Sequence, residues 1–335
     1  AMRVALYEGS WEKYHKGTKF ATEDNHTEFF QEVMKWGDEQ FFKSKLALNT
    51  KDTDKEYVNA EDAFAHLFNK KDLSQIQEAV LWKKYSVADG VFHRLGALLA
   101  SGAVDGQGPS GLSKSLVDNY LNADGTFINP KDEKYKDFNE MFKERDARLL
   151  VTVMHSGPDC KYRASSPTNK PMNVRAYDAT GTEDEMKEKN EDIVSPNLNG
   201  DGNSKSVTGF HIRLGIDTTY VDNESETVVV LFRYAEGLLC YAEAAEELDL
   251  CTDDVLNKTL KPLRERAGVT YVKPTKADPN FPFTGLSPVL QEIRRERRSE
   301  LALQGFRLDD LMRWAVAGTL KGQDGRGRGA YLGED

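Results

Sequence analysis

The sequence predicts a mainly α-helical protein with tetratricopeptide-like helix packing and a loop-rich insert that carries a few short β-strands. Three observations support this fold class. Apolar residues recur at spacings of three and four in both terminal parts of the chain, which is the period of an amphipathic helix. The middle part holds short β-prone runs. Long stretches rich in Gly, Ser, Asn, Asp and Pro separate these runs.

The chain has 335 residues, enough for one large domain or two ordinary ones. We expect one domain overall, in three segments. Residues 1–74 form helices that complete the scaffold, and residues 75–220 form the loop-rich insert with the ligand-binding site. Residues 221–335 form a C-terminal helical region.

The first fifty residues are expected to form helices, with a break at Gly37. Apolar side chains recur there, and those from Phe29 to Trp36 lie at spacings of three and four. The recurring residues are Leu6, Phe20, Phe29, Phe30, Val33, Met34 and Trp36. A further helix over residues 62–69 would place Phe64, Leu67 and Phe68 on one face.

The insert is expected to contain short strands over residues 76–87, 149–154 and 210–216. Trp82 falls in the first of these runs, and we expect it to pack in the core. The insert also holds two long polar loops, residues 101–115 and 155–208. Structureless stretches of this length are usually binding loops or disordered segments.

The chain is expected to become helical again at about Val228. One helix covers RYAEGLLCYAEAAEEL, and a second, over residues 253–267, is expected to end at Gly268 as its C-cap. The apolar stripe of the first helix consists of Tyr234, Leu238, Tyr241 and Ala245. This pair resembles a tetratricopeptide-type unit, which cannot bury its own apolar face. We therefore expect residues 1–70 to supply helices that pack against it.

A third helix is expected to begin with Ser287 as N-cap and Pro288 at N1, and to stop at Gly305. A helical pattern then resumes over FRLDDLMRW. The third helix alternates basic and acidic residues, namely Arg294, Arg295, Arg297 and Arg298 with Glu292, Glu296 and Glu300. This alternation favours a helix with many ion pairs over a nucleic-acid-binding patch.

Several motifs together resemble the SusD/RagB family. ERRSELALQGFRLDDLMRW, from Glu296 to Trp314, closely resembles the family signature E-R-x-x-E-L-x-x-E-G-x-R-x-x-D-L-x-R-W, with Gln304 in place of the second glutamate of that pattern. RYAEGLLCYAEA and LKPLRERAGV are similar to two upstream segments of the family. ERDARLLVTV is similar to a third, with Ala147 where proline is usual, and TGFHIRL to a fourth, with Leu214 where lysine is usual. RVALYEGSWEKYH resembles a helix from the middle of the family's precursors.

The resemblance implies a non-catalytic glycan-binding lipoprotein on the extracellular face of the outer membrane in a Bacteroidetes-like cell. Its partners would be a glycan and a SusC-like TonB-dependent transporter. It would contact the membrane only through an N-terminal lipid anchor that this chain does not contain. We expect the chain to be a fragment without the lipidated cysteine, the N-terminal helical repeats and the extreme C-terminus.

The signature itself is expected to be structural. Arg297, Glu300, Arg307 and Asp310 would be partly buried between helices, where a charge needs a partner. Gly305 would allow a sharp turn. Trp314 would pack a large area.

Glycan binding requires an aromatic platform with polar groups on loops around it. Two loops fit this description. The proposed ligand-binding residues are Phe92, His93, Arg94, Asp105, Gln107, Tyr162, Arg163 and Asn173. For each of them, an ordinary role in the surface or in local packing remains the alternative.

No cofactor is expected, although a structural calcium ion is one alternative. Asn199, Asp201 and Asn203 in NGDGNSK have the spacing that begins a calcium loop, but the terminal glutamate of such a loop is missing, which favours a plain turn. Three cysteines, Cys160, Cys240 and Cys251, are too few for a disulfide framework. One bridge among them remains an alternative.

The net charge of −10 opposes binding to nucleic acid. HExxH, GxSxG, Walker and CxxC motifs are all absent from the sequence, and we expect no catalysis. Three alternatives stay open. The chain could be a helical scaffold for a protein partner, a binder of a non-sugar nutrient such as a peptide, or a glycoside hydrolase whose two carboxylates lie far apart in sequence.

Overall fold

A computed structural model describes residues 1–52, 55–56, 59–94, 111–135, 137, 140–155, 172–174, 192–194, 208–215 and 224–318. Its longer helices are α1 (Met2–His15), α2 (His26–Trp36), α3 (Ala60–Asn69), α8 (Tyr234–Glu247), α11 (Pro288–Glu300) and α12 (Phe306–Arg313). Its shorter helices are α5 (Lys114–Val117), α6 (Ala147–Thr152), α9 (Asp253–Lys258), α10 (Leu260–Arg266) and the 3₁₀ turns η2 (Glu133–Tyr135) and η3 (Glu140–Phe142). The described strands form two-stranded sheets from β1 (Lys51–Asp52) and β2 (Lys55–Glu56), β3 (Ala79–Lys83) and β6 (Val229–Arg233), and β4 (Met172–Val174) and β5 (Asp192–Val194). The predicted mainly helical class is confirmed.

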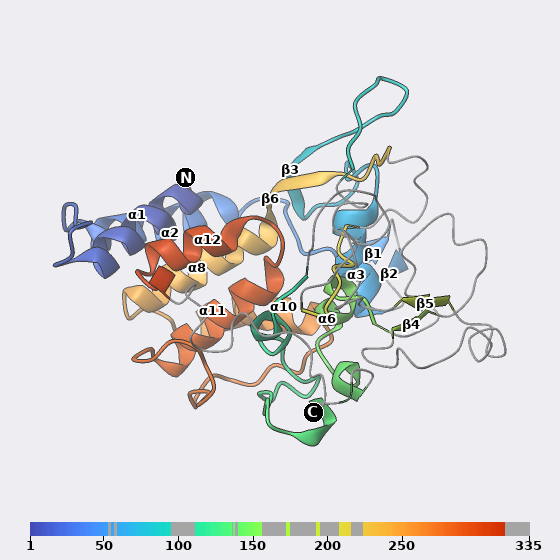
Figure 1. Ribbon diagram of the computed structural model, residues 1–335. Helices are drawn as coiled ribbons and strands as arrows, with labels where there is room; N and C mark the ends of the chain where they lie inside the picture. The colour runs from blue at the N-terminus through green and yellow to red at the C-terminus, as the bar shows by residue number, and fades with distance from the viewer. Residues whose placement is uncertain are drawn as a thin grey trace.

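The N-terminal helices pack against the C-terminal ones in a single helical body (Figure 1). α1 and α2 contact each other and α8, α11 contacts α8, and α12 contacts α1. The buried cluster between α1, α2 and α8 consists of Leu6, Phe30, Val33, Cys240 and Ala244. This packing confirms the expectation that the first seventy residues supply helices to cover the C-terminal pair.

Gly37 lies where α2 approaches α8. The α-helix ends at Trp36, as expected, but the chain continues as a turn of π-helix, η1 (Gly37–Phe41), instead of breaking. A Cβ atom at Gly37 would lie 2.2 Å from the ring of Tyr241. Glycine therefore permits a helix contact that no larger residue allows.

β3 pairs with β6 in an antiparallel ribbon that leads directly into α8. Ala79 lies opposite Arg233, and Lys83 lies opposite Val229. The strand predicted over residues 76–87 is confirmed for its central part. The expected core position of Trp82 is wrong, since the side chain is only half-buried, as befits a ribbon that projects from the helical body (Figure 1).

The described part of the insert has its own apolar core. It contains Leu112, Val117, Tyr120, Ile128, Tyr135, Met141, Phe142, Leu149, Val153, Met154, Phe210 and Ile212. The buried guanidinium of Arg145 donates hydrogen bonds to the backbone carbonyls of Val117 (2.9 Å) and Met141 (2.8 Å). This one side chain thus fixes neighbouring turns around the core.

The strand expected over residues 149–154 is wrong, because most of it belongs to helix α6. Asp146 caps this helix by accepting a hydrogen bond from the backbone N–H of Arg148 (2.9 Å). A short apolar run fits a buried helix turn as well as a strand. Val153 alone bridges to Ile212 as a strand residue would, within the run expected at residues 210–216.

Two further helix predictions need correction. The helix expected over residues 253–267 is split at Thr259 into α9 and α10. Pro262 explains the break, because proline has no N–H to donate and is tolerated in the first turn of a new helix. Phe20 lies outside both N-terminal helices, in the loop between them, and its side chain is exposed.

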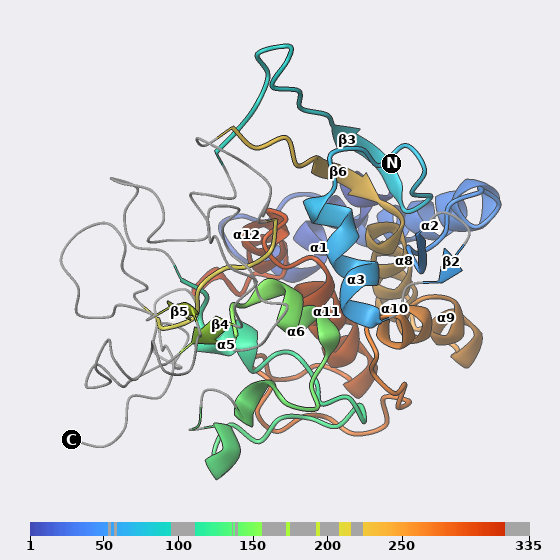
Figure 2. The same cartoon turned by 90° about the vertical axis from the view of Figure 1, so that its right-hand side faces the viewer.

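α11 begins as predicted. The Ser287 side chain accepts a hydrogen bond from the backbone N–H of Leu290 (3.0 Å), and Pro288 follows the cap. The helix ends at Glu300, and a turn leads to Gly305, whose φ is +87°. α3, α6, α10 and α11 meet at the centre of the molecule (Figure 2). Within the described residues, no helix is both long and apolar enough to cross a bilayer.

Candidate functional site

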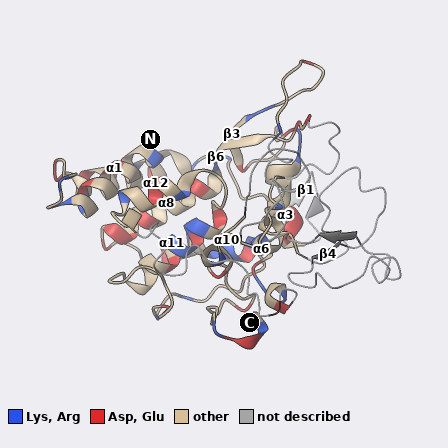
Figure 3. Cartoon of the chain, viewed as in Figure 1, with Lys and Arg blue, Asp and Glu red and all other residues tan. Residues whose placement is uncertain are grey.

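The acidic side chains of α11 pair with arginines from three distant segments of the chain, and Figure 3 shows the two charge types side by side along α11 and α10. Glu300 accepts hydrogen bonds from Arg148 (2.6 Å) and Arg233 (2.5 Å), and it pairs with Arg266. All four side chains are buried. Burial alone would raise the pKa of Glu300, but the three guanidinium groups hold it well below its usual value.

Glu296, one turn earlier on α11, extends this network. It accepts hydrogen bonds from Arg148 (2.5 Å) and Arg264 (3.1 Å). Arg264 also donates to Glu292 (2.6 Å). A buried charge costs several kcal/mol unless it is paired and hydrogen-bonded, so the network must form as a unit.

A second network joins α8, α11 and α12. Arg297 donates to Asp310 (2.8 Å), and Arg313 donates to Glu243 (2.6 Å). The indole N–H of Trp314 also donates to Glu243 (2.6 Å). The predicted burial of Arg297, Asp310 and Trp314 is confirmed.

Arg307 differs from its neighbours in the signature, since it is half-buried and stacks on rings. Its guanidinium carbon lies 5.6 Å from the ring centroid of Phe283 and 5.8 Å from that of Trp314. The signature residues therefore hold helices together.

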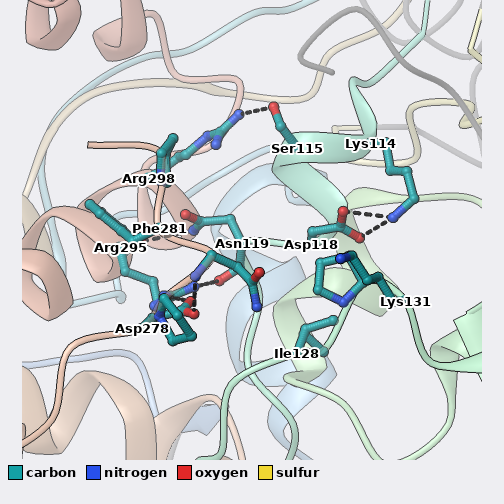
Figure 4. A pocket seen from close by; sticks show the side chains of 14 residues that line it. Lys114, Ser115, Asp118, Asn119, Ile128, Lys131, Asp278, Phe281, Arg295 and Arg298 are labelled. Carbon is teal, nitrogen blue, oxygen red and sulfur yellow. Dashed lines mark hydrogen bonds and ion pairs between the residues drawn. The ribbon is translucent and has the colours of Figure 1, made fainter. Parts of the chain in front are cut away.

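A cleft of about 500 Å³ lies between α5 and α11 (Figure 4). Lys114 and Asp118 come from α5 and the turn after it, and Arg295 and Arg298 come from α11. Phe281 lies on the side of the arginines, opposite the α5 residues. This volume is within the range of small-ligand sites.

Ion pairs fix most of the charged groups of the cleft. Lys114 donates to both carboxylate oxygens of Asp118, at 2.7 and 2.6 Å. Arg295 donates to Asp278 (2.5 Å) and to Glu292 (2.8 Å). These pairs hold the walls in one arrangement, so the cleft is preformed.

Arg295 also supports the aromatic wall of the cleft. The guanidinium carbon of Arg295 lies 5.2 Å from the ring centroid of Phe281 and 5.1 Å from the ring centroid of Phe127. Arg298, nearer the surface, donates to the hydroxyl of Ser115 (2.8 Å). The cleft thus combines one half-buried aromatic ring with amide, hydroxyl, carboxylate and cationic groups.

The sequence profile of the SusD family matches residues 69–334. The chain belongs to the SusD family. Four of the six motifs meet in the buried arginine network, where Glu300 of the signature pairs with Arg148, Arg233 and Arg266 from three others.

Solved structures share the fold. A SusD-like carbohydrate-binding protein from Bacteroides fragilis aligns with a TM-score of 0.58 at 22% identity, over 95% of this chain and 51% of that one. A second SusD-like protein from Bacteroides fragilis aligns with a TM-score of 0.54 at 19% identity, over 94% of this chain and 53% of that one. The chain thus spans about half the length of these relatives. No curated protein matches the chain.

Three sequence-predicted ligand residues of this SusD-family chain lie in the segment that follows β3, where an isolated bridge joins His93 to Ser225. The side chains of Phe92 and Arg94 are exposed. His93 is turned toward its own ribbon, where its Nε2 lies 2.7 Å from the carbonyl oxygen of Thr227 and its ring packs edge-on to Tyr85. His93 therefore has a local packing role.

The other predicted site residues lie outside the described parts of the chain. Asp105, Gln107, Tyr162 and Arg163 are not among the described residues, nor are the calcium candidates Asn199, Asp201 and Asn203. Asn173 lies in strand β4, of which the structure describes the backbone. These assignments remain predictions.

The described residues can be searched for a metal site and for a disulfide bridge. The described residues contain no group of three or more His, Cys, Asp or Glu side chains arranged to hold a metal ion. Cys240 and Cys251 are free thiols, and burial raises the pKa of each to about 12. A bridge between these two cysteines is therefore not formed, while Cys160 lies outside the described residues.

Sequence reasoning missed the cleft between α5 and α11. Its lining comes from segments near residues 114–131, 278–282 and 295–298. The one available signal was the aromatic pair in the FPF segment, Phe281 and Phe283, within a run of prolines and polar residues. That signal does not predict which helices would face it.

Proposed function

We propose that this protein binds glycan at the cell surface without catalysing a reaction, and that the cleft between α5 and α11 holds part of an oligosaccharide. The observation that carries the proposal is the match of the SusD family over residues 69–334. One fold relative, from Bacteroides fragilis, is described as a carbohydrate-binding protein, which supports a sugar as the ligand class.

The chemistry of the cleft suits a sugar. Sugars present an apolar C–H face together with a rim of hydroxyl groups. The half-buried ring of Phe281 offers a platform for the face, and Ser115, Asp118 and the exposed Asn280 offer polar groups for the rim. Both kinds of contact are available within one preformed site.

The state of the carboxylates supports binding without hydrolysis. A glycoside hydrolase needs one protonated carboxylic acid beside the scissile bond. Of the described lining residues, Asp118 and Asp278 carry carboxylates, and each is paired with a cation, Lys114 or Arg295. Both carboxylates already accept hydrogen bonds from these cations, at 2.6 Å for Lys114 and 2.5 Å for Arg295. This engagement within the protein opposes the role of general acid.

Family membership also suggests where the protein acts. We infer that it is anchored by an N-terminal lipid to the outer face of the outer membrane, and that it delivers its glycan to a SusC-like TonB-dependent transporter. Co-purification of such a transporter with the tagged protein from its native membrane tests this partner. Failure to recover any transporter after chemical cross-linking would count against it.

Affinity electrophoresis in gels that contain individual polysaccharides tests glycan binding directly. We expect retardation by at least one polysaccharide, with no new reducing ends after long incubation. New reducing ends would show a hydrolase. Absence of retardation by every polysaccharide would favour a scaffold or a peptide-binding protein.

Two matched variants locate the site. We expect Phe281→Leu, which removes the aromatic platform but keeps apolar volume, to weaken retardation, because stacking on a ring is lost. Phe92→Leu is the matched control, because it makes the same exchange at an exposed position outside the cleft. Loss of binding in Phe92→Leu with full binding in Phe281→Leu would place the sugar on the ribbon instead. Thermal melting of both variants checks that each is folded.

A further inference from the structure

We infer that Asn119, which lines the cleft between α5 and α11, recognises an unmodified sugar hydroxyl that donates a hydrogen bond to its Oδ1 atom. This inference rests on the proposed function and names a residue that determines which glycan fits. The observation behind it is a buried amide whose nitrogen has both of its hydrogen bonds within the protein, while its oxygen has none among the described residues.

The orientation of the Asn119 amide is fixed from α11. Its Nδ2 donates to the backbone carbonyl of Arg295 (3.0 Å) and to the hydroxyl of Ser299 (2.7 Å). A backbone carbonyl can only accept hydrogen bonds, so the amide nitrogen must face α11 and the amide oxygen must point elsewhere. The oxygen is therefore held in one direction before a ligand arrives.

The Oδ1 atom of Asn119 is an open acceptor in a nearly closed position. The residue is only 5% exposed, yet Oδ1 is not sealed within the protein. It accepts no hydrogen bond from any residue that the structure describes. A ligand without a donor at this point would displace water from Oδ1 and leave it unpaired, which is unfavourable. A ligand hydroxyl replaces the bond to water.

The carboxylates of the cleft, in contrast, already have partners. Both oxygens of Asp118 accept hydrogen bonds from Lys114, and Asp278 accepts one from Arg295 (2.5 Å). These acceptors are satisfied without a ligand. Among the described side chains that line the cleft, Asn119 thus gains most from a donor on the sugar.

This requirement separates sugars by the group that they carry at one carbon atom. A hydroxyl can donate to Oδ1, whereas an ether, a sulfate or a fluorine at the same carbon cannot. Phe281 offers a platform for the C–H face of the same sugar unit. The cleft therefore takes a sugar unit whose hydroxyl at this contact is free.

Calorimetric titration with modified oligosaccharides tests the inference. The parent ligand is an oligosaccharide from a polysaccharide that retards the protein in affinity gels. Its analogues each have one hydroxyl replaced by fluorine, which cannot donate a hydrogen bond. We expect one analogue to bind the wild-type protein about tenfold more weakly than the parent, because a polar site rejects a ligand that lacks the matching donor.

Variants link the sensitive hydroxyl to Asn119. Asn119→Ala should bind the parent about tenfold more weakly, and should bind the sensitive analogue as well as the parent, because the lost donor and the lost acceptor belong to one hydrogen bond. A purely structural role would weaken the parent and all analogues alike. Asn257→Ala, at an exposed position of α9 outside the cleft, should bind each ligand as the wild type does.

Asn119→Ala also removes two hydrogen bonds to α11, so thermal melting checks that it is folded. Asn119→Ser is the second variant. Its hydroxyl can still donate to a partner on α11, but it lacks the amide oxygen. The same loss of discrimination between the parent and the sensitive analogue is expected.

Equal binding of the parent and of every analogue by the wild-type protein would overturn the inference and leave glycan binding intact. A sensitive analogue that stays about tenfold weaker than the parent in the folded variants would also overturn it, because the hydroxyl would then contact another residue. Absence of binding to every oligosaccharide would overturn the proposed function itself.

Discussion

Glu300 is the acidic centre of the buried arginine network. It meets Arg148, Arg233 and Arg266, which come from three segments that lie far apart in the sequence. The sequence predicted that Glu300 would be buried and paired. It did not predict the partners, because the spacing of residues along the chain does not say which helix ends converge.

Replacement of Glu300 by glutamine should therefore be costly. Glu300→Gln keeps the size of the side chain but leaves Arg148, Arg233 and Arg266 with less compensating charge in a buried site. We expect the free energy of unfolding to fall by about 3–5 kcal/mol, measured by urea denaturation. Glu265→Gln, at an exposed position of α10, should change it by less than about 1 kcal/mol. Similar stability of the two variants would contradict this role.

Glu243 makes stability depend on pH. Burial alone would raise its pKa, but Arg313 and neighbouring arginines lower it from 4.5 to about 2. A carboxyl group whose pKa is lower in the folded state stabilises the fold above its unfolded pKa and loses this effect as pH falls through its folded pKa. We therefore expect about 3 kcal/mol of stability to disappear between pH 4.5 and pH 2 because of this group.

Urea unfolding at several pH values measures this contribution. Glu243→Gln should be less stable at neutral pH and should lose less stability than the wild type on acidification. Glu265→Gln should keep the wild-type pH dependence. If the unfolding free energy of Glu243→Gln falls with pH as steeply as that of the wild type, other carboxyl groups control acid unfolding.

At the level of elements, the strongly periodic helices were predictable and the short ones were not. α2, α8 and the cap of α11 follow from apolar spacing and from Ser287–Pro288, whereas α1 was expected chiefly from its resemblance to a helix of the family. α6 was mistaken for a strand, because its length is too short for periodicity to decide. α11 was expected to carry ion pairs along its own surface, yet most of its charges pair with other segments and are buried.

The turn between α11 and α12 depends on Gly305. Its φ of +87° is unfavourable for residues with a Cβ atom, although the space around it is open. Gly305→Ala should therefore cost about 1–2 kcal/mol of unfolding free energy through backbone strain alone. Gly318→Ala, at a position with open space and no positive φ, is the matched control and should cost nothing measurable. Equal stability of both variants in thermal melting would contradict the strain.

At the level of the whole molecule, the fold was predictable from motifs, but the cleft was not. Four of the six motifs meet in one buried network. The cleft instead combines Lys131, Phe281 and Arg298, whose proximity results from how the insert packs on α11. No short motif contains all three. The site predicted from the sequence was therefore placed on loops. Of its residues, Phe92 and Arg94 belong to the described segment that follows β3, and both are exposed.

A crystal structure of the protein with an oligosaccharide taken from a polysaccharide that retards it in affinity gels tests the central claim most directly. We predict an intact sugar between α5 and α11, with one ring against Phe281 and hydroxyl groups near Asp118 and Asn280. An intact sugar bound on the β3–β6 ribbon beside Phe92, with none in the cleft, would contradict the claim. A cleaved sugar in the cleft would contradict the absence of catalysis.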